Sequence, residues 1–512
     1  MAIKKLLDAV TGEWRNVSYG LTREDTFQSG SPREYLMKQL ELETIHGETF
    51  DIENIVVDVA YHESIESAFL RADISVVDAS NFYQRLQGGE KIHINCVTAT
   101  ALDKEPLQTT LQVYKIGSVI KAERGQMYVL HCVSPEMYHD EMNKVFKGFG
   151  PGEKSKAPKE NCLPRMICED YLKCKGNAKK VKAKSFENHS PYSFISCNWK
   201  PSDVIAYISD RVSRIEAKGS SKGSNKQSGF LFWENRNGFN FRSIDGIASG
   251  GATQGNVYTY TYQMKGNEGV DGRYAIETVS YPDKSNHLEN MRMGTYKNSA
   301  IGISMGEQKN SYAPTSGKKE QADESEDWRA TATGGAGKNP APGGTISAPR
   351  ILTLNDVYGK ANKVTEAYGG RAEMPIQIPE FFDIEKAKPT RMKIRVLPGL
   401  TKQPNTSAPN NGTNPNIDAM AVAQYAAARY NLLKAIKLNI TVPGNTELTA
   451  GSLIKVIIPA SLQDGDNVQT DEQFSGLYLI AGLTHLYRRT GITTKLYLVR
   501  DSKPESQKKK TA

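Results

Sequence analysis

Hydrophobic and polar residues alternate in short runs between about residues 55 and 133, which is the pattern of strands that bury one face. The runs at 91–96 and 107–113 alternate most regularly. Gly88-Gly89 lies just ahead of the first run, and Arg124-Gly125 lies between later ones. We therefore expect antiparallel strands joined by tight turns, in the form of a small barrel or sandwich.

The hydrophobic period then changes to that of helices. Ser134-Pro135 supplies an N-cap and a first-turn proline, and apolar residues follow at helical spacing as far as Phe149. Ser202 precedes a second apolar stripe over 205–215, so its hydroxyl is expected to cap a second helix.

Strand patterns return in the second half of the chain. Aromatic residues alternate over 230–235 up to Asn237-Gly238, a dipeptide that favours a type I′ turn, which predicts a hairpin at 230–241. The β-prone runs at 257–262 and 274–281 indicate the start of a second sheet. A helix from about 417 and apolar strands within 452–499 are expected to close the chain.

One long stretch has the composition of a linker. Residues 310–349 contain ten Gly or Pro and few apolar side chains, too few to bury the surface that would order them. A similar stretch covers 401–415, and a short apolar piece with Ile394 and Val396 lies between the two. We therefore expect a flexible insertion over 307–415.

Length and composition exclude several classes of protein. A chain of 512 residues has room for about three domains, and 38% hydrophobic with 24% charged residues is ordinary for a globular protein. No stretch approaches the length of uncharged apolar residues that a membrane-spanning helix or a signal peptide needs. The six irregularly spaced cysteines favour reduced thiols over a disulfide framework.

The net positive charge is concentrated in one segment. The whole chain has 65 Lys and Arg against 57 Asp and Glu, a net charge of +8, and residues 144–200 alone hold 13 against 5. A solvated loop face is the simpler interpretation of such a run. The functional alternative is a docking patch for an acidic neighbour, with Lys179, Lys180 and Lys182 as the candidate residues.

A zinc site is not expected. Cys162, Cys168 and Cys174 are spaced six apart, with Cys197 and His189 as further possible ligands. Structural zinc sites use close pairs such as C-x2-C, and a six-residue step on a helix would not bring the thiols together. We therefore predict partly buried free cysteines, no metal and no cofactor.

No motif assembles a catalytic site. The stretch GFGPGEKS at 148–155 departs from a phosphate-binding loop because Glu153 separates Gly152 from Lys154. Neither an H-E-x-x-H nor a G-x-S-x-G motif is present, and no carboxylate stands out in an apolar surround that would raise its pKa. The chain is expected not to be an enzyme, and no catalytic residue is assigned.

Four stretches, taken in order, carry a resemblance to a known family. They are 67–98, 228–247, 287–303 and the closing helix-and-strand block at 416–499. In this order they resemble the central baseplate hub proteins of T4-type contractile-tailed bacteriophages, which are related to the first domains of VgrG spike proteins. The resemblance covers about 55–306 and 416–500, and its specificity rests on the order of the stretches.

The resemblance implies a mainly β, α+β fold. It has two antiparallel β-barrel tube-like domains, a helix-containing middle domain and the flexible insertion. The implied ranges are an N-terminal extension at 1–14, a first barrel at 15–134, the middle domain at 135–250, a second barrel at 251–306 plus 416–503, the insertion at 307–415 and a basic tail at 504–512.

The same resemblance implies a structural virion protein. A homotrimer with duplicated barrels would present pseudo-sixfold edges to the tail tube protein and a threefold face to the central spike protein. Baseplate wedge proteins are further implied partners, and DNA would pass through the channel without specific binding. The implied location is the tail baseplate of the virion, assembled in the host cytoplasm.

Two other functions stay open on the sequence. One is a nucleic-acid-binding protein that uses the lysine-rich segment at 144–200, whose affinity would fall steeply with salt. The other is a hub-attached cell-wall hydrolase.

Overall fold

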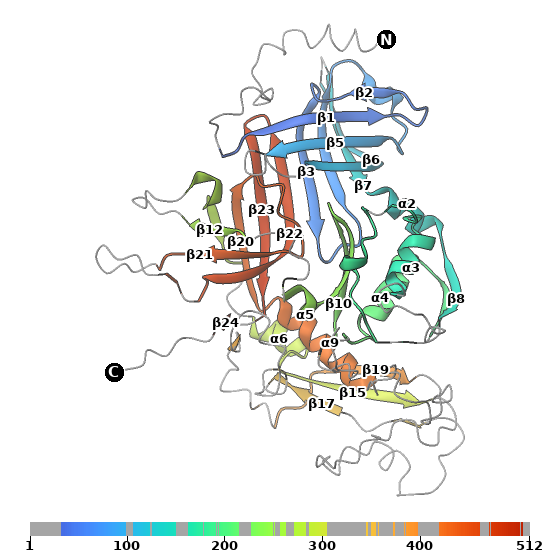
Figure 1. Cartoon of the computed structure of the whole chain (residues 1–512), viewed down its shortest axis with the longest axis vertical. Helices are drawn as coiled ribbons and strands as arrows, with labels where there is room; N and C mark the ends of the chain where they lie inside the picture. The colour runs from blue at the N-terminus through green and yellow to red at the C-terminus, as the bar shows by residue number, and fades with distance from the viewer. Residues whose placement is uncertain are drawn as a thin grey trace, which may run out of the picture.

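The computed structural model is mainly β, and one sheet of fourteen strands runs through it (Figure 1). The structure describes residues 32–98, 106–122, 125–149, 162–177, 179–190, 192, 194–214, 227–248, 250, 257–262, 271–282, 286–304, 345–346, 350–354, 357, 372–373, 383, 386–397, 419–460, 470–471, 473–501 and 503–504. The predicted α+β class with mainly β content is confirmed, whereas closure of the strands into two barrels stays a prediction.

The first β-unit is an antiparallel sheet in the order β2-β1-β5-β6-β7-β4-β3. Its strands are β1 (Tyr35–Glu43), β2 (Thr49–Asp51), β3 (Val56–Ser64), β4 (Arg71–Asp78), β5 (Lys91–Thr98), β6 (Leu107–Ala122) and β7 (Gly125–Val133). The alternation seen in the sequence places Ile92, Ile94 and Leu111 in the core of this unit. Arg124, expected in a turn between strands, lies outside the described residues.

The second β-unit continues the same sheet. Its strands are β12 (Thr259–Tyr262), β13 (Ala275–Ile276), β14 (Thr278–Ser280), β20 (Ile436–Pro443), β21 (Leu453–Ile457), β22 (Gly476–Arg488) and β23 (Gly491–Arg500). The long strand β22 pairs with β21 and β23 and also, antiparallel, with β3, from Gly482 opposite Ser64 to Arg488 opposite Asp58. The two units are therefore joined edge to edge, and each keeps its own apolar core.

The middle region contains short helices and two antiparallel pairs of strands. Its elements are α2 (Pro135–Met142), β8 (Val145–Phe149), α3 (Leu163–Asp170), β9 (Phe194–Trp199), α4 (Pro201–Ser209), β10 (Phe230–Asn235), β11 (Gly238–Ser243) and α5 (Ile244–Ala248). Strands β8 and β9 form one pair. Strands β10 and β11 form the predicted hairpin, but its turn is at Arg236 and Asn237, because Gly238 already pairs with Asn235. Neither turn residue has a positive φ, so the expected type I′ turn is wrong, and the positive φ of 108° is at Gly238. Within the described residues no helix is both long and apolar enough to cross a membrane.

Two details of the helices differ from expectation. Helix α2 ends at Met142, and the apolar residues that follow belong to strand β8. Neither serine is a side-chain cap: Ser134 makes no cap hydrogen bond, and the N-cap of α4 is Lys200. Ser202 lies inside the first turn because Pro201 begins the helix, and its hydroxyl donates to Asp140 Oδ2 at 2.6 Å.

A separate four-stranded sheet lies below the large one in Figure 1. It consists of β15 (Lys297–Ser304), β16 (Thr345–Ile346), β17 (Arg350–Thr353) and β19 (Arg391–Leu397), next to helices α6 (His287–Arg292) and α9 (Ala419–Leu433). The core between sheet and helix includes Tyr296, Leu354, Ala428 and Leu432.

This sheet corrects the expectation for the insertion. Strand β15 was assigned to the second barrel, yet it pairs with β16, β17 and β19, which all come from 307–415. Strands β16, β17 and β19 of that insertion are thus ordered by pairing with β15. Another pair, β18 (Ala372–Glu373) with β24 (Lys503–Pro504), also involves it. Residues 1–31, most of 307–415 and 505–512 lie outside the described residues, and the remaining domain boundaries stay predictions.

Candidate functional site

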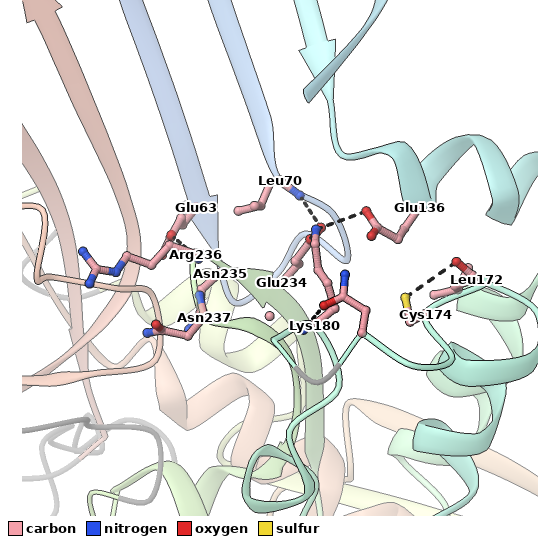
Figure 2. A network of polar contacts seen from close by, with 12 residues as sticks. Glu63, Leu70, Glu136, Leu172, Cys174, Lys180, Glu234, Asn235, Arg236 and Asn237 are labelled. Atoms are coloured by element: carbon pink, nitrogen blue, oxygen red, sulfur yellow. Dashed lines mark hydrogen bonds and ion pairs between the residues drawn. The ribbon is translucent and has the colours of Figure 1, made fainter. Parts of the chain in front are cut away.

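The three predicted docking lysines do not share one surface. They lie on the loop that precedes β9, where Lys179 is exposed and Lys182 is partly exposed. Lys180 turns inward between α2 and β10: its Nζ lies 3.2 Å from Glu136 Oε2 and forms an ion pair with Glu234 Oε1 (Figure 2). Lys180 is therefore committed to the fold, which corrects its assignment as a docking residue.

Glu234 is the most buried member of this ion-pair group, with 1% of its surface exposed. It also accepts a hydrogen bond from the backbone N–H of Leu70 at 3.2 Å, which ties β10 to the start of β4. Burial raises the pKa of Glu234, and the ammonium of Lys180 opposes this. Burial acts to lower the pKa of Lys180, but the charges of Glu234 and Glu136 outweigh it and raise the pKa, so the ammonium stays protonated.

The loop that holds Lys180 packs directly against the hairpin turn. The N–H of Phe239 donates to the carbonyl oxygen of Lys180 at 2.8 Å. Gly238 has a positive φ, and a Cβ at this position would overlap the carbonyl oxygens of Lys179 and Lys180. Only glycine combines this positive φ with the close approach of the two backbones.

A second buried carboxylate lies on the other side of the hairpin. Glu63 at the end of β3 is 3% exposed and accepts hydrogen bonds from Arg236 N at 2.7 Å, Ala450 N at 2.8 Å and Tyr61 Oη at 3.0 Å. Burial raises the pKa of Glu63 to about 7, although the three hydrogen bonds act to lower it. The carboxylate therefore fixes the hairpin turn and the loop before β21 at the end of β3 (Figure 2).

The hairpin also bonds to the loop between β20 and β21. The Arg236 guanidinium donates to the carbonyl oxygen of Thr446 and lies 3.4 Å from Glu447 Oε1. Trp233 Nε1 donates to the carbonyl oxygen of Ala450 at 3.0 Å. Polar groups at the hairpin turn thus reach both β-units.

We call Glu63, Glu136, Lys180, Glu234 and Arg236 the junction. It connects the first β-unit, the middle region and the second β-unit, which are far apart in the sequence. Its carboxylates are buried and engaged by donors from the protein, so they hold the parts of the chain in place. Buried charges of this kind are tolerated only when they are paired and hydrogen-bonded.

An open cleft of about 560 Å³ lies beside the junction, between β3 and the helices α2 and α4. Its walls carry both signs of charge. Lys200 Nζ pairs with Glu141 Oε1 at 2.5 Å, and Asp140 accepts from the N–H and the hydroxyl of Ser202 at 2.7 and 2.6 Å. These contacts fix the N-terminus of α4 and its position relative to α2.

The cysteines considered as zinc ligands lie in the core of the middle region. Cys162, Cys168 and Cys174 are buried in one apolar cluster, whereas Cys197 is exposed on β9. Burial raises the pKa of Cys162 and of Cys174 to about 12, which keeps these thiols protonated. The ring of His189 bonds to the carbonyl oxygen of Ser190 at 2.8 Å. In the part of the chain that the structure describes, no three His, Cys, Asp or Glu side chains are grouped to hold a metal.

The sequence contains a signal for the buried carboxylates Glu63 and Glu234. No carboxylate was expected in an apolar surround, yet Glu63 and Glu234 occupy such positions and have raised pKa values. On β3, Glu63 continues the inward row of Val59 and Tyr61. On β10, Glu234 continues an alternating row of aromatic residues. A carboxylate that extends an apolar row at period two therefore indicates a buried acid with a partner.

Comparison with known proteins returns tail and secretion proteins. No family profile and no curated protein matches the sequence. The fold is similar to a tail protein from Neisseria meningitidis, at TM-score 0.45 and 10% identity over 91% of this chain and 97% of that one. A prophage MuSo2 tail protein from Shewanella oneidensis gives a TM-score of 0.44 at 11% identity, over 90% of this chain and 98% of that one. An Escherichia coli component of the type VI secretion system gives a TM-score of 0.35 at 9% identity, over 93% of this chain and 77% of that one.

Proposed function

We propose that this protein is the central hub of a contractile-tail baseplate. In this role it forms a homotrimer that seats the central spike, adapts the threefold spike to the sixfold tail tube and nucleates tube assembly. The observation that carries the proposal is the pairing of β3 with β22, which fuses two strand-rich units into one sheet within a single chain. The order of the four stretches that resemble hub proteins supports the same function.

The physical argument concerns symmetry. A closed ring of three identical chains has threefold symmetry, and two similar units in each chain give it six lobes. The adaptor works only if the two units keep a fixed angle within each chain. The continuous sheet supplies one constraint on that angle, and the junction supplies a second, because Glu63 and Arg236 bind the hairpin to both units.

The proposal assigns structural partners and no reaction. The central spike, the tail tube and the baseplate wedge proteins would each contact a different surface of the trimer, and DNA would pass through the channel without specific binding. The protein would be located in the tail baseplate of the virion after assembly in the host cytoplasm.

The test is the assembly state of the full chain. Light scattering on the purified protein, alone and with the spike, should give the mass of a trimer or of a trimer bound to spike. Images of the particle should show a threefold ring with six lobes around a channel. A stable monomer under all assembly conditions would contradict the proposal, as would cleavage of peptidoglycan by the isolated chain.

A further inference from the structure

Strands β8 and β9 form a two-stranded antiparallel ribbon at the right-hand edge of the molecule in Figure 1. In the described chain they pair only with each other. The register places Phe146 opposite Cys197 and Gly148 opposite Ile195, so these four residues form one face. That face is solvent-exposed, with Phe146 at 78% and Ile195 at 67%. We call it the outer face of the ribbon.

The opposite face is firmly packed, so the exposure of the outer face is not the result of a loose segment. The rings of Phe149 and Phe194 stack with their centroids 5.1 Å apart, and the ring centroids of Trp199 and Tyr207 of α4 are 4.7 Å apart. The Ser196 hydroxyl donates to the carbonyl oxygen of Val145 at 2.8 Å across the ribbon. The outer face is therefore presented in a fixed conformation, which lowers the entropic cost of binding.

The charged residues at β8 are positive. Lys144 and Lys147 are exposed at β8, and neither strand contains an acidic residue. Lys147 belongs to the face opposite Phe146, because successive side chains of a strand point to opposite faces, and its Nζ lies 5.9 Å from the ring of Phe149. Single exposed apolar residues are common on protein surfaces, but neighbouring large ones on a strand pair with free edges mark a contact surface.

We propose that the outer face of the ribbon is the docking surface for an acidic, extended segment of a neighbouring tail protein. A strand added at the edge of the ribbon points alternate side chains to its two faces. Its apolar side chains would extend the outer face beside Phe146 and Ile195, and its carboxylates would point to the opposite face, towards Lys147, with Lys144 just before β8. Addition of a strand to a free ribbon edge supplies backbone hydrogen bonds, and the alternate side chains supply specificity. Only the location of the partner in a tail rests on the proposed function.

The chemistry of the face favours this occupant over two others. A second copy of the same ribbon, paired edge to edge, would place its Lys147 on the same face as the first Lys147, and like charges repel. Duplex DNA would satisfy the lysines but would leave Ile195 and Phe146 against a charged backbone, where an aliphatic side chain has no stacking partner. An acidic strand with apolar residues at alternate positions satisfies both the charge and the apolar side chains.

The probe is a synthetic peptide of about nine residues in which Glu and Val alternate, long enough for one strand. Binding to the full chain is measured by fluorescence anisotropy of the dye-labelled peptide. We expect saturable binding that weakens with salt, and no binding of the same peptide with Lys in place of Glu. The rate at which a bimane reagent labels Cys197 gives a second readout. Bound peptide should slow the labelling, since Cys197 lies on the outer face and the other five cysteines are buried.

Two pairs of substitutions test the two components of the surface. Phe146→Ser with Ile195→Ser is expected to weaken binding about tenfold, as for central apolar contacts. Lys144→Glu with Lys147→Glu should weaken binding of the acidic peptide by a similar factor and admit the Lys peptide. The matched control is Leu288→Ser with Lys455→Glu, an exposed apolar residue on α6 and an exposed lysine on β21. It should leave the affinity unchanged.

The inference is overturned if the acidic peptide does not bind, or if a duplex oligonucleotide binds to the ribbon instead. It is also overturned if the control substitutions weaken peptide binding as much as the two pairs of substitutions at the ribbon. These outcomes are separate from the fate of the proposed function. A trimer that does not bind the peptide would leave the hub proposal standing and remove this surface. A monomer that binds the peptide through the ribbon would do the reverse.

Discussion

The segment 144–200 contains two regions that use positive charge in opposite ways. In the junction, Lys180 lies between Glu136 and Glu234 and serves the fold. On the ribbon, Lys144 and Lys147 are exposed beside Phe146 and remain available to a partner. A lysine that is buried must find its counter-charge inside the molecule, whereas an exposed lysine needs none. Burial therefore distinguishes the lysine that stabilises this chain from the lysines that can bind another protein.

The strongest test of this difference is Lys180→Met. The variant leaves Glu234 and Glu136 without their counter-charge in a buried site, and removal of one partner of a buried pair costs about 3 to 5 kcal/mol. We expect the midpoint of urea denaturation, followed by tryptophan fluorescence, to fall strongly. The fluorescence of Trp233 reports directly on the hairpin, because its indole binds Ala450.

Lys179→Met is the matched control, because it removes the same charge from the exposed neighbour on the same loop. Its effect on stability should stay within about 0.5 kcal/mol, the usual range for surface substitutions. Equal effects of the two variants would show that Lys180 is not an internal residue, and the contrast between junction and ribbon would be lost.

Protonation of Glu63 should make the stability of the junction depend on pH. Its pKa is raised from 4.5 to about 7 in the folded chain, so the folded state binds this proton more tightly than the unfolded state. Folding then takes up a proton between these two values, and the contribution of Glu63 to stability decreases as pH rises through that window and is constant above it. The size of the change is on the order of 3 kcal/mol.

Glu63→Gln isolates this contribution because glutamine does not titrate. The stability of the natural chain relative to the variant should be greatest near pH 4.5 and should decline towards pH 8. Glu48→Gln, on the exposed turn between β1 and β2, is the control and should show no such decline. A difference between natural chain and Glu63→Gln that does not change with pH would mean that Glu63 is not desolvated in the folded protein.

The elements of the fold could be predicted from the sequence wherever one period dominated. The alternation over 91–96 identified β5, and the Asn237-Gly238 dipeptide identified the β10–β11 hairpin, although its turn lies one residue earlier. The joining of β3 with β22 could not be predicted, because alternation defines which face of a strand is buried and not which strand is its neighbour. The insertion was misjudged for a related reason: strands β16, β17 and β19 are stabilised by pairing with β15, a long-range contact that composition does not record.

The candidate site was predicted less well than the fold. A run of lysines specifies a net charge, and the structure divides that run between interior and surface according to where carboxylates lie in space. The partners of Lys180 are 44 and 54 residues away in the sequence, so the residues around Lys180 do not predict its ion pairs. The row of inward residues that ends in Glu234 was the local signal for one of them.

A smaller effect is expected from Gly238→Ala. The positive φ costs a non-glycine residue about 1 kcal/mol, and overlap of the new Cβ with the carbonyls of Lys179 and Lys180 adds roughly as much again. Gly176→Ala is the control, because its φ is also positive but no atom lies within 4 Å of the added carbon. The excess destabilisation of Gly238→Ala over Gly176→Ala in urea denaturation measures the backbone contact alone. Equal losses would show that the loop of Lys180 does not press on the hairpin turn.

The smallest effect on stability should come from Phe146→Ser, although it removes a large aromatic side chain. A phenylalanine that is 78% exposed loses little apolar contact when it is truncated, so the midpoint of denaturation should shift by no more than about 0.5 kcal/mol. Phe149→Ser, on the packed face of the same strand, should cost several times more, because it removes the stacking on Phe194. If the two variants were equally destabilising, the outer face would already be covered within the chain and unavailable to a partner. If only Phe149→Ser destabilises the protein, Phe146 contributes little to the stability of the isolated chain, and its exposed side chain is available to bind a partner.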